Sequence, residues 1–290
     1  MDIRKWLLAN TSSLKGKTVA VTGSTGGLGE ELCKYLAKLG ADLVLVDRNH
    51  GKSVSFALEL TDNYGAEVSC VTADLEDIDS VKRAVDELLT LDVDIFIHNA
   101  GAYSIPRHKC KTGLDNVFMI NFASPYYMIR KLLPSLRERN GRVVVVGSIA
   151  HNYSKADPDD VDFSTRKAAS KVYGNAKRYL MFSLLELFKE EREVSLSVTH
   201  PGIAFTNITA HYPKLIFAVI KYPMKLIFMK PKAASLSILR GVFDNTGYNE
   251  WIGPCIFDVW GLPNKKKLAT VSDKESAFIA DAADKIYRSL

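Results

Sequence analysis

The sequence predicts an α/β fold in which one doubly wound parallel sheet carries helices on both faces. Short β-branched runs alternate with helical segments along most of the 290 residues, which is the pattern of a parallel sheet with crossover helices. The strand runs, such as Val143–Val146, are continuously apolar, as expected of strands buried on both faces. No Pro-, Gly- or Ser-rich linker and no repeat divides the chain. We therefore expect residues 1–290 to form a single domain.

The elements follow in order from their patterns. Apolar β-branched runs predict strands, and apolar residues at helical spacing predict helices. The expected strands are residues 18–22, 42–46, 67–72, 93–98, 142–146 and 194–198. The expected helices are residues 30–39, 50–64, 80–90, 114–137 and 164–189. Residues 272–290 also look helical, with Ser272 and Glu275 spaced as a capping box. Residues 1–16 form an N-terminal extension, and residues 206–264, a lid and variable region, resist a regular interpretation.

Composition excludes several classes of protein. The formal net charge of +5 is modest, and the lysines and arginines are spread along the chain apart from a few local clusters. The densest cluster, Lys265–Lys267, suits a solvated loop better than a nucleic-acid site. No nucleic-acid partner is therefore expected. The four cysteines have no metal-ligand spacing, which predicts no metal site and free, buried or partly buried thiols in a reducing compartment. No apolar run has the length of a secretory signal core or of a membrane span. The expected location is the cytoplasm.

A glycine-rich turn follows the first expected strand and opens a helix. Glycines let the backbone approach a pyrophosphate, and the helix N-terminus offers N–H donors and a partial positive charge. Because the turn lies at a strand-to-helix junction, it predicts a dinucleotide site and a Rossmann-type sheet. The candidate cofactor-binding residues of this turn are Gly23, Ser24, Thr25, Gly27, Leu28 and Gly29.

Asp47 ends the second expected strand, 18 residues beyond Gly29. An acidic residue at about this distance binds the adenosine ribose hydroxyls and would repel a 2′-phosphate, which favours NAD. Arg48 follows directly, and an arginine there pairs with a 2′-phosphate or stacks on adenine, so NADP stays open. A purely structural role for Asp47 at the start of the next helix also stays open.

Tyr173 and Lys177 are four residues apart on an expected helix. That spacing places both side chains on one face, where the ammonium favours the phenolate over the phenol. A surface tyrosine and lysine at helical spacing would produce the same pattern. The pair alone therefore indicates only a candidate proton-transfer site.

Together these motifs resemble the short-chain dehydrogenase/reductase family over residues 17–206. Thr22, Gly23, Gly27 and Gly29 match the glycine turn of the family, and Asn121, Ser148, Tyr173 and Lys177 match its catalytic tetrad. The remaining matches are Asp74 and Leu75 beside the adenine, Asn99, Ala100 and Gly101 after the fourth strand, and Pro201, Gly202 and Thr206 at the nicotinamide carboxamide. His98 departs from the family pattern, which has Asn there.

The resemblance implies an NAD- or NADP-dependent alcohol dehydrogenase or carbonyl reductase. Tyr173 would be the acid/base, Ser148 would donate to the substrate oxygen, and Asn121 would hold a water that links Lys177 to solvent. Tyr173 and Lys177 would also contact the cofactor. Two other functions stay open: a sugar-nucleotide epimerase or dehydratase, and a cofactor-binding regulator without turnover.

The 25 residues between Ser148 and Tyr173, with the segment Gly147–His151, resemble most the branch of retinol dehydrogenases and steroid or lipid carbonyl reductases. The resemblance implies a hydrophobic alcohol or ketone as substrate. The acidic insertion at residues 152–162 would rim the site or form a plain surface loop.

Residues 212–232 interleave large apolar residues with lysines, and Pro213 and Pro223 interrupt them. The pattern favours a short helical lid over the substrate; contact of the same segment with an anionic membrane surface is the less favoured alternative. Family members pair through the two long helices after the fourth and fifth strands, so a homodimer or homotetramer stays open.

Overall fold

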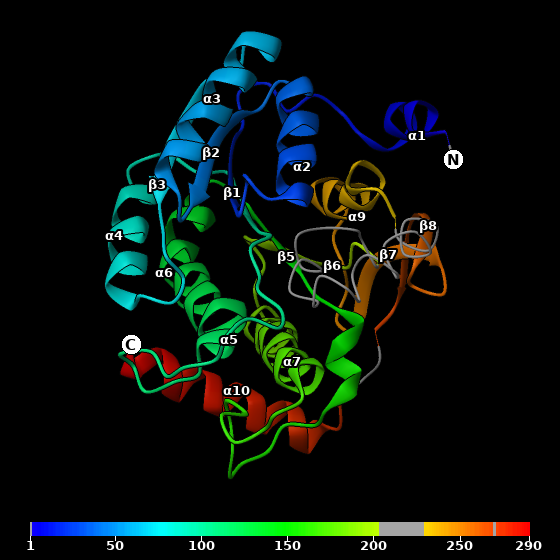
Figure 1. Ribbon diagram of the computed structural model, residues 1–290. Helices are drawn as coiled ribbons and strands as arrows, with labels where there is room; N and C mark the ends of the chain where they lie inside the picture. The colour runs from blue at the N-terminus through cyan, green and yellow to red at the C-terminus, as the bar shows by residue number, and fades with distance from the viewer. Residues whose placement is uncertain (1, 203–228, 269–270) are drawn as a thin grey trace, which may run out of the picture.

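The computed structural model describes residues 2–202, 229–268 and 271–290. Over these residues one eight-stranded sheet has the order β3-β2-β1-β4-β5-β6-β7-β8. Neighbouring strands are parallel from β3 through β7, and β8 runs antiparallel to β7. The predicted α/β fold with a doubly wound, mostly parallel sheet is confirmed (Figure 1).

The strands coincide with the apolar runs of the sequence. Their bounds are β1 Thr18–Thr22, β2 Asp42–Asp47, β3 Val68–Thr72, β4 Ile95–His98, β5 Arg142–Val146, β6 Ser195–Thr199, β7 Glu250–Ile256 and β8 Trp260–Lys267. The inner strands β4 and β5 are almost wholly buried. Continuous apolar runs thus correspond to strands covered on both faces.

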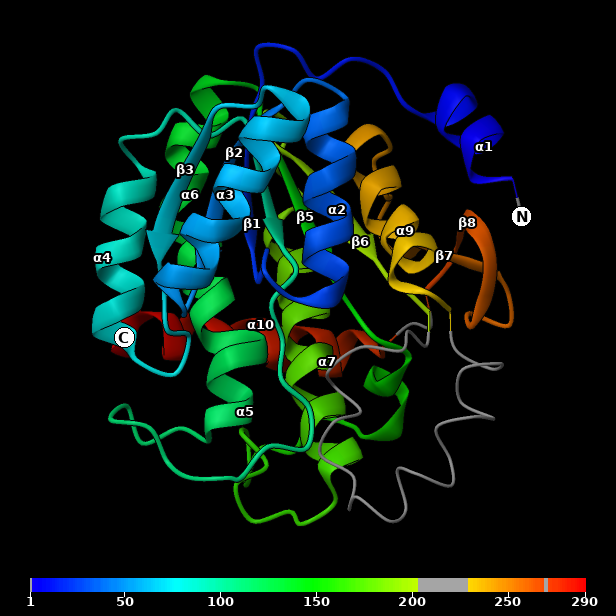
Figure 2. The same ribbon diagram turned by 45° about the horizontal axis from the view of Figure 1, so that its top comes forward.

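Helices cover both faces of the sheet, as Figure 2 shows. One face carries α1 (Ile3–Asn10), α2 (Gly27–Lys38), α3 (His50–Tyr64) and α9 (Pro231–Phe243). The other face carries α4 (Ile78–Leu88), the run α5 (Asn116–Phe118), η1 (Met119–Ala123) and α6 (Ser124–Glu138), and α7 (Ala169–Leu187). Each face has its own apolar core against the sheet.

The predicted start of the α7 helix at residue 164 is wrong, because the helix begins at Ala169. The preceding residues are held in a loop by hydrogen bonds to a carboxylate and by one residue with a positive φ. The Asp160 carboxylate accepts from Ser164 and Thr165, and Phe163 has a positive φ of 54°. Side-chain partners therefore outweigh the local helical pattern there.

The irregular stretch predicted at residues 206–264 contains regular structure in its described part, namely α9, β7 and most of β8. The N-terminal extension also holds a helix, α1, which buries Trp6. Thr206 and residues 212–228 of the expected lid lie outside the described residues.

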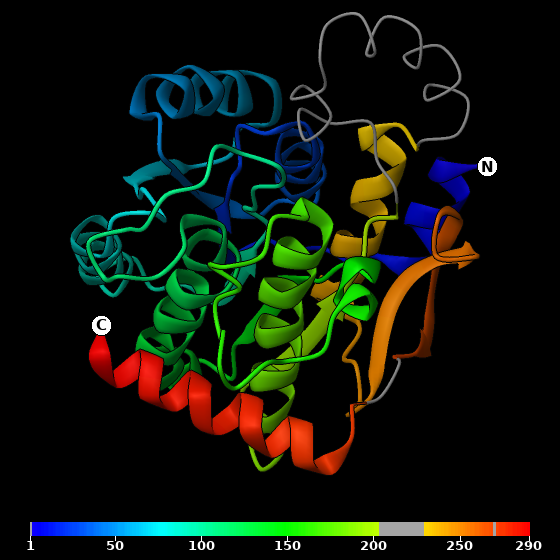
Figure 3. The ribbon, with the colours of Figure 1, turned by 60° about the horizontal axis from the view of Figure 1, so that its bottom comes forward.

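The C-terminal helix α10 (Asp273–Ser289) packs across α7 and α6, on the side away from the sheet (Figure 3). Only half of the expected capping box forms. Ser272 Oγ accepts from the Glu275 N–H at 3.2 Å, but the Glu275 carboxylate turns to Arg178 instead of to the cap. This helix packs on α6 and α7, the two long helices after β4 and β5.

The four cysteines are free thiols in the structure. Cys33 is buried, and Cys70 and Cys110 are partly buried; Cys255 is exposed, so the expectation of buried or partly buried thiols is wrong for it. Among the described helices, none combines the length and apolar character that crossing a bilayer requires.

Candidate active site

The predicted site residues gather at one edge of the sheet. Thr22, Asp47, His98, Val146 and Thr199 end five parallel strands. The candidate residues lie at these ends, in the turns that follow them, or on the helices η1 and α7. Parallel strands place their carboxyl ends at the same edge, where α/β folds bind ligands. The fold thus brings distant parts of the sequence together.

The glycine turn between β1 and α2 is packed too tightly for side chains at two positions. Gly23 has a φ of 68°, and a Cβ there would lie 2.9 Å from Ala100 Cα. A Cβ at Gly29 would lie 2.1 Å from the Gly23 carbonyl oxygen. Gly26 is the N-cap of α2 and supplies no side-chain acceptor to the first N–H groups. The helix N-terminus is therefore left to bind an anion, which fits a pyrophosphate.

Asp47 lies directly against this turn, with 6% of its surface exposed. Its carboxylate accepts hydrogen bonds from Ser24 Oγ, from Thr25 N at 3.2 Å, from Thr25 Oγ1 at 3.1 Å and from Ser53 Oγ at 3.2 Å. The N-cap of α3 is Asn49. Asp47 therefore fastens the turn to β2 and does not cap the next helix.

A cavity of about 300 Å³ adjoins the turn. Asp47, Arg48 and Lys52 line one side of it, with both cations exposed to solvent. Asp74 and Leu75 line another side, where the Asp74 carboxylate accepts from the Glu76 N–H at 3.0 Å. The predicted adenosine-binding residues therefore share one cavity.

Asn99, which follows β4, joins that strand to the end of β1. Its side-chain amide donates to the carbonyl oxygens of Thr22 and Gly23, at 3.1 and 3.0 Å. Thr22 Oγ1 accepts from the backbone N–H groups of Asn99 and Ala100 and contacts His98 Nδ1 at 3.0 Å. Burial, then the nearby charge of Lys177, lowers the pKa of His98 well below its ordinary 6.5. The imidazole in the place of the family's asparagine is therefore neutral.

Asn121 lies in a π-helical turn, η1, in which the Ser124 N–H donates to the Met119 carbonyl. Its amide donates to Ala102 O at 2.9 Å and to Val117 O at 2.8 Å, and its oxygen accepts from Ala102 N at 3.2 Å. The side chain thereby fixes the segment after Gly101. Such π turns recur at functional sites, but periodicity in the sequence did not reveal this one.

Ser148 follows β5 and begins the 3₁₀ helix η2 (Ile149–Tyr153). Its hydroxyl accepts from the Ala150 N–H at 3.2 Å. Its carbonyl accepts from the His151 N–H at 3.1 Å and lies 2.6 Å from His151 Nδ1. The hydroxyl position therefore depends on where η2 lies.

Tyr173 is partly buried in the second turn of α7, with its ring 5.4 Å from the Tyr103 ring in an edge-to-face contact. Burial raises the pKa of its phenol to about 12, although a side-chain hydrogen bond with Ser148 acts in the opposite direction. The structure brings Tyr173 and Ser148 together. The phenol keeps its proton at neutral pH in this state.

Lys177 is 1% exposed, and its ammonium lies 5.8 Å from the centre of the Tyr173 ring. The ammonium donates to Val146 O at 2.8 Å. Burial lowers the pKa of Lys177 from 10.5 to about 7. The expected face of the helix is confirmed, and the lysine is a buried residue and not a solvated one.

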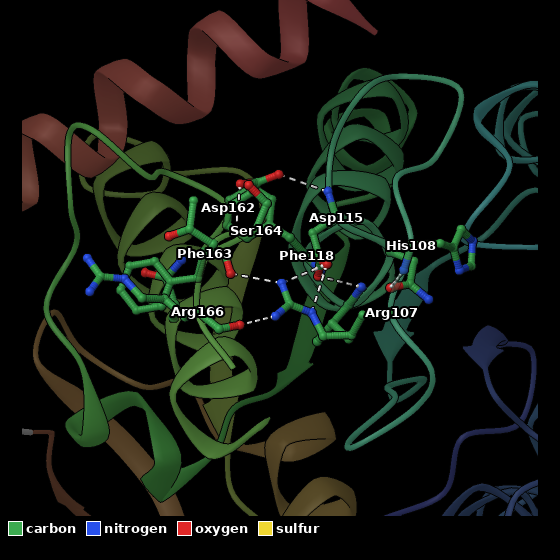
Figure 4. A network of polar contacts seen from close by, with 12 residues as sticks. Arg107, His108, Asp115, Phe118, Asp162, Phe163, Ser164 and Arg166 are labelled. Carbon is green, nitrogen blue, oxygen red and sulfur yellow. Dashed lines mark hydrogen bonds and ion pairs between the residues drawn. The ribbon is translucent and has the colours of Figure 1, made fainter. Parts of the chain in front are cut away.

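Two residues that hold the site were missed by the sequence reasoning. Gly174 allows η2 to approach α7, because a Cβ there would lie 2.2 Å from the Ala150 carbonyl oxygen. Arg107 joins the loop after β4 to the loop before α7, donating to the carbonyls of Phe163 and Arg166 and pairing with Asp115 at 2.8 Å (Figure 4). Its 59-residue separation from Arg166 leaves no local sequence signal.

The expected insertion at residues 152–162 belongs to the same polar network. Asp162 accepts from the Asp115 N–H at 2.9 Å, so it fixes the start of α5 (Figure 4).

The segment predicted to hold the nicotinamide carboxamide begins with Pro201, which is buried, and Gly202, which has a φ of 79° and lies beside Val259 and Pro254. The predicted carboxamide segment is therefore described only as far as Gly202.

Comparisons with known proteins agree with this geometry. The sequence model of the family described as short chain dehydrogenase matches residues 17–214. Human polyprenol dehydrogenase is 25% identical over 254 residues, which cover 81% of this chain and 77% of that protein. Mouse retinol dehydrogenase 12 is 30% identical over 202 residues, covering 68% and 64% of the two chains. A crystal structure of an uncharacterized protein from Mycobacterium Paratuberculosis, 21% identical, covers 97% of this chain with a TM-score of 0.77 and 96% of its own length.

Proposed function

Because the chain belongs to the short-chain dehydrogenase family, we propose that it is a nicotinamide-dependent alcohol dehydrogenase or carbonyl reductase. The observation that carries the proposal is the placement of Ser148, Tyr173 and Lys177 together at the carboxyl edge of the sheet, beside the glycine turn. Asn121, from a third element, fixes the backbone next to them.

The residues present fit a dinucleotide. The two crowded glycines Gly23 and Gly29 and the uncapped start of α2 suit a pyrophosphate. The cavity lined by Asp47, Asp74 and Leu75 suits the adenosine end. When bound, the nicotinamide would accept or supply the hydride of the reaction.

Tyr173 would transfer the proton. In carbonyl reduction the phenol gives its proton to the substrate oxygen as the carbon is reduced; in alcohol oxidation the phenolate takes the hydroxyl proton. The raised phenol pKa of about 12 suits the first direction as the site stands. Oxidation needs added positive charge near the phenol, which Lys177 in its ammonium form would supply.

Ser148 would donate its hydroxyl proton to the same substrate oxygen and stabilise the negative charge that develops there. Lys177 would hold the nicotinamide ribose, and Asn121 would fix a water leading from Lys177 to solvent. Both assignments follow from the match of these residues to the family tetrad.

A hydrophobic substrate is supported by the surroundings of Tyr173. Val117, Phe163 and Val172 form a small apolar cluster, and Ile105 and Tyr173 pack against it. The names of two relatives specify polyprenol and retinol, which are long apolar alcohols. We therefore propose a steroid-, retinoid- or lipid-like alcohol or ketone.

NAD is the cofactor that we propose. A 2′-phosphate at the ribose would lie near the buried carboxylate of Asp47, and each unit of like charge at about 4 Å costs at least about 1 kcal/mol. Arg48 and Lys52, which line the same cavity, would offset part of this repulsion if NADP binds.

The test follows the absorbance of reduced nicotinamide with apolar alcohols and ketones, using small hydrophilic alcohols for comparison. Turnover of the apolar compounds that Tyr173→Phe abolishes supports the proposal. Turnover that survives Tyr173→Phe overturns the assigned acid/base. Cofactor binding without any turnover by the wild-type chain would indicate a regulator instead.

A further inference from the structure

The 3₁₀ helix η2 lies directly on the helix that carries the proton-transfer residues. Ser154 Oγ donates to the Lys171 carbonyl at 3.1 Å, and Gly174 leaves room for the Ala150 carbonyl. Tyr173 and Lys177 lie on the neighbouring face of the same helix, toward the carboxyl edge of the sheet. The distance between Ser148 and Tyr173 therefore depends on how η2 packs against α7.

Arg178 fastens the same contact one turn beyond Gly174. Its side chain is 8% exposed, and its Nη1 donates to the His151 carbonyl at 3.0 Å. Nε and Nη2 donate to the two carboxylate oxygens of Glu275 at 2.7 and 2.8 Å. A guanidinium held along one edge by a bidentate carboxylate has a fixed plane, so the hydrogen bond from Nη1 to the His151 carbonyl has a fixed direction.

Glu275 holds the other end of the segment. Besides Arg178 it accepts from the Ala156 backbone N–H at 2.9 Å. Burial acts to raise the pKa of Glu275, but the hydrogen bonds from Arg178 and Ala156 lower it below its ordinary 4.5. The carboxylate of the C-terminal helix is thus charged and joined both to α7 and to the segment that follows η2.

The contacts continue from η2 to the serine. His151, whose carbonyl Arg178 holds, binds the Ser148 carbonyl through its own N–H and its Nδ1. Ser148 Oγ in turn accepts from Ala150 N. A shift of His151 would therefore move the hydroxyl that the proposed reaction uses.

We propose that Arg178 and Glu275 are positioning residues: the ion pair uses the docked C-terminal helix α10 to hold Ser148 at the correct distance from Tyr173. The inference rests on the proposed function for its kinetic consequence. It adds to that function because neither residue contacts the cavity that would bind the cofactor.

The experiment compares two matched substitutions on α10 in the full chain. Glu275→Gln removes the carboxylate that faces Arg178, and Asp284→Asn removes the carboxylate that faces Arg130 at 3.3 Å. Both weaken an arginine contact of the same helix, but only the first contact reaches η2. Two substitutions of Arg178 complete the set. Arg178→Met removes the positive charge, and Arg178→Lys keeps the charge but loses the planar guanidinium that donates to both carboxylate oxygens.

We expect Glu275→Gln and Arg178→Met to lower kcat by roughly 10- to 100-fold, the cost of a displacement of about 1 Å at a reacting group. KM and the Kd for reduced cofactor should change less than about twofold, Arg178→Lys should recover part of the loss, and Asp284→Asn should keep the wild-type kcat. Equal kcat values for Glu275→Gln and Asp284→Asn would overturn the inference, since both variants lose a helix contact.

Amide hydrogen exchange over residues 149–156 separates this inference from the proposed function. Exchange there should be faster in Glu275→Gln than in Asp284→Asn whether or not the wild type turns over any compound tested. If the wild type is inactive but this difference is present, the proposed reaction fails and the positioning role of Arg178 and Glu275 stands. If the difference is absent, that positioning role is wrong.

Discussion

Replacing the buried lysine should make the protein more stable while removing its activity. Lys177 is 1% exposed and its pKa falls from 10.5 to about 7 through burial. At about 1.4 kcal/mol for each pH unit between these values, the buried ammonium costs the folded state on the order of 5 kcal/mol near neutral pH. Lys177→Met removes this cost and fills the same space.

Part of the gain is lost again. The variant leaves the Val146 carbonyl without the ammonium that donates to it at 2.8 Å, and an unpaired buried acceptor costs about 1–3 kcal/mol. We therefore expect Lys177→Met to be more stable than the wild type by on the order of 2 kcal/mol at neutral pH.

The lowered pKa of Lys177 also determines how the stability of the wild type changes with pH. Between about pH 7 and 10.5 the unfolded chain binds the Lys177 proton more tightly than the folded chain does, so wild-type stability rises with pH. Raising the pH by two units from neutrality should remove on the order of 2 kcal/mol of the wild-type penalty, which cancels the advantage of the variant.

Urea unfolding of the two proteins at neutral pH and two units above it measures this difference, with the exposed Lys171 of the same helix replaced by Met as the control. The reasoning is refuted if Lys177→Met is the less stable protein at both pH values, or if Lys171→Met shows the same pH-dependent gain.

Three other outcomes are expected. Tyr173→Phe should lower kcat by about 10²–10⁴-fold with little change in Tm; a small loss would assign the proton to another group. Gly174→Ala should cost about 1–3 kcal/mol in urea unfolding, because its Cβ meets the Ala150 carbonyl at 2.2 Å, whereas Gly51→Ala meets only ordinary contact and should not destabilise. Asp47→Asn should weaken NADH binding and narrow its preference over NADPH in fluorescence titrations; tighter NADPH binding by the wild type would contradict the NAD assignment.

The sequence predicted what depends on local patterns. Strand positions followed from apolar β-branched runs, and the Tyr173 and Lys177 face followed from a four-residue spacing. The glycine turn was recognised because its strand and helix context is also local. These features need no knowledge of distant contacts.

What the sequence missed depends on pairs that are far apart in the chain. Arg178 and Glu275 are 97 residues apart, and Glu275 carries an equally good local interpretation as part of a capping box. The sequence also left open a solvated Lys177, which is wrong because the side chain is buried; a four-residue spacing does not reveal burial. The predicted start of α7 at residue 164 is too early because hydrogen bonds from Ser164 to Asp160 and from Arg107 to the Phe163 carbonyl hold the preceding residues in a loop.

The π-helical turn at Met119–Ala123 makes chain length a determinant of the site. Because a π turn holds one residue more per turn than an α-helix, deleting one residue here would restore an α-helix and move the residues of η1 out of their present positions. The packed helix α6 would stay, and the change would fall on Asn121, which lies in η1. A deletion that improves the helix should therefore impair the site, whereas substitutions that preserve the count should be tolerated better.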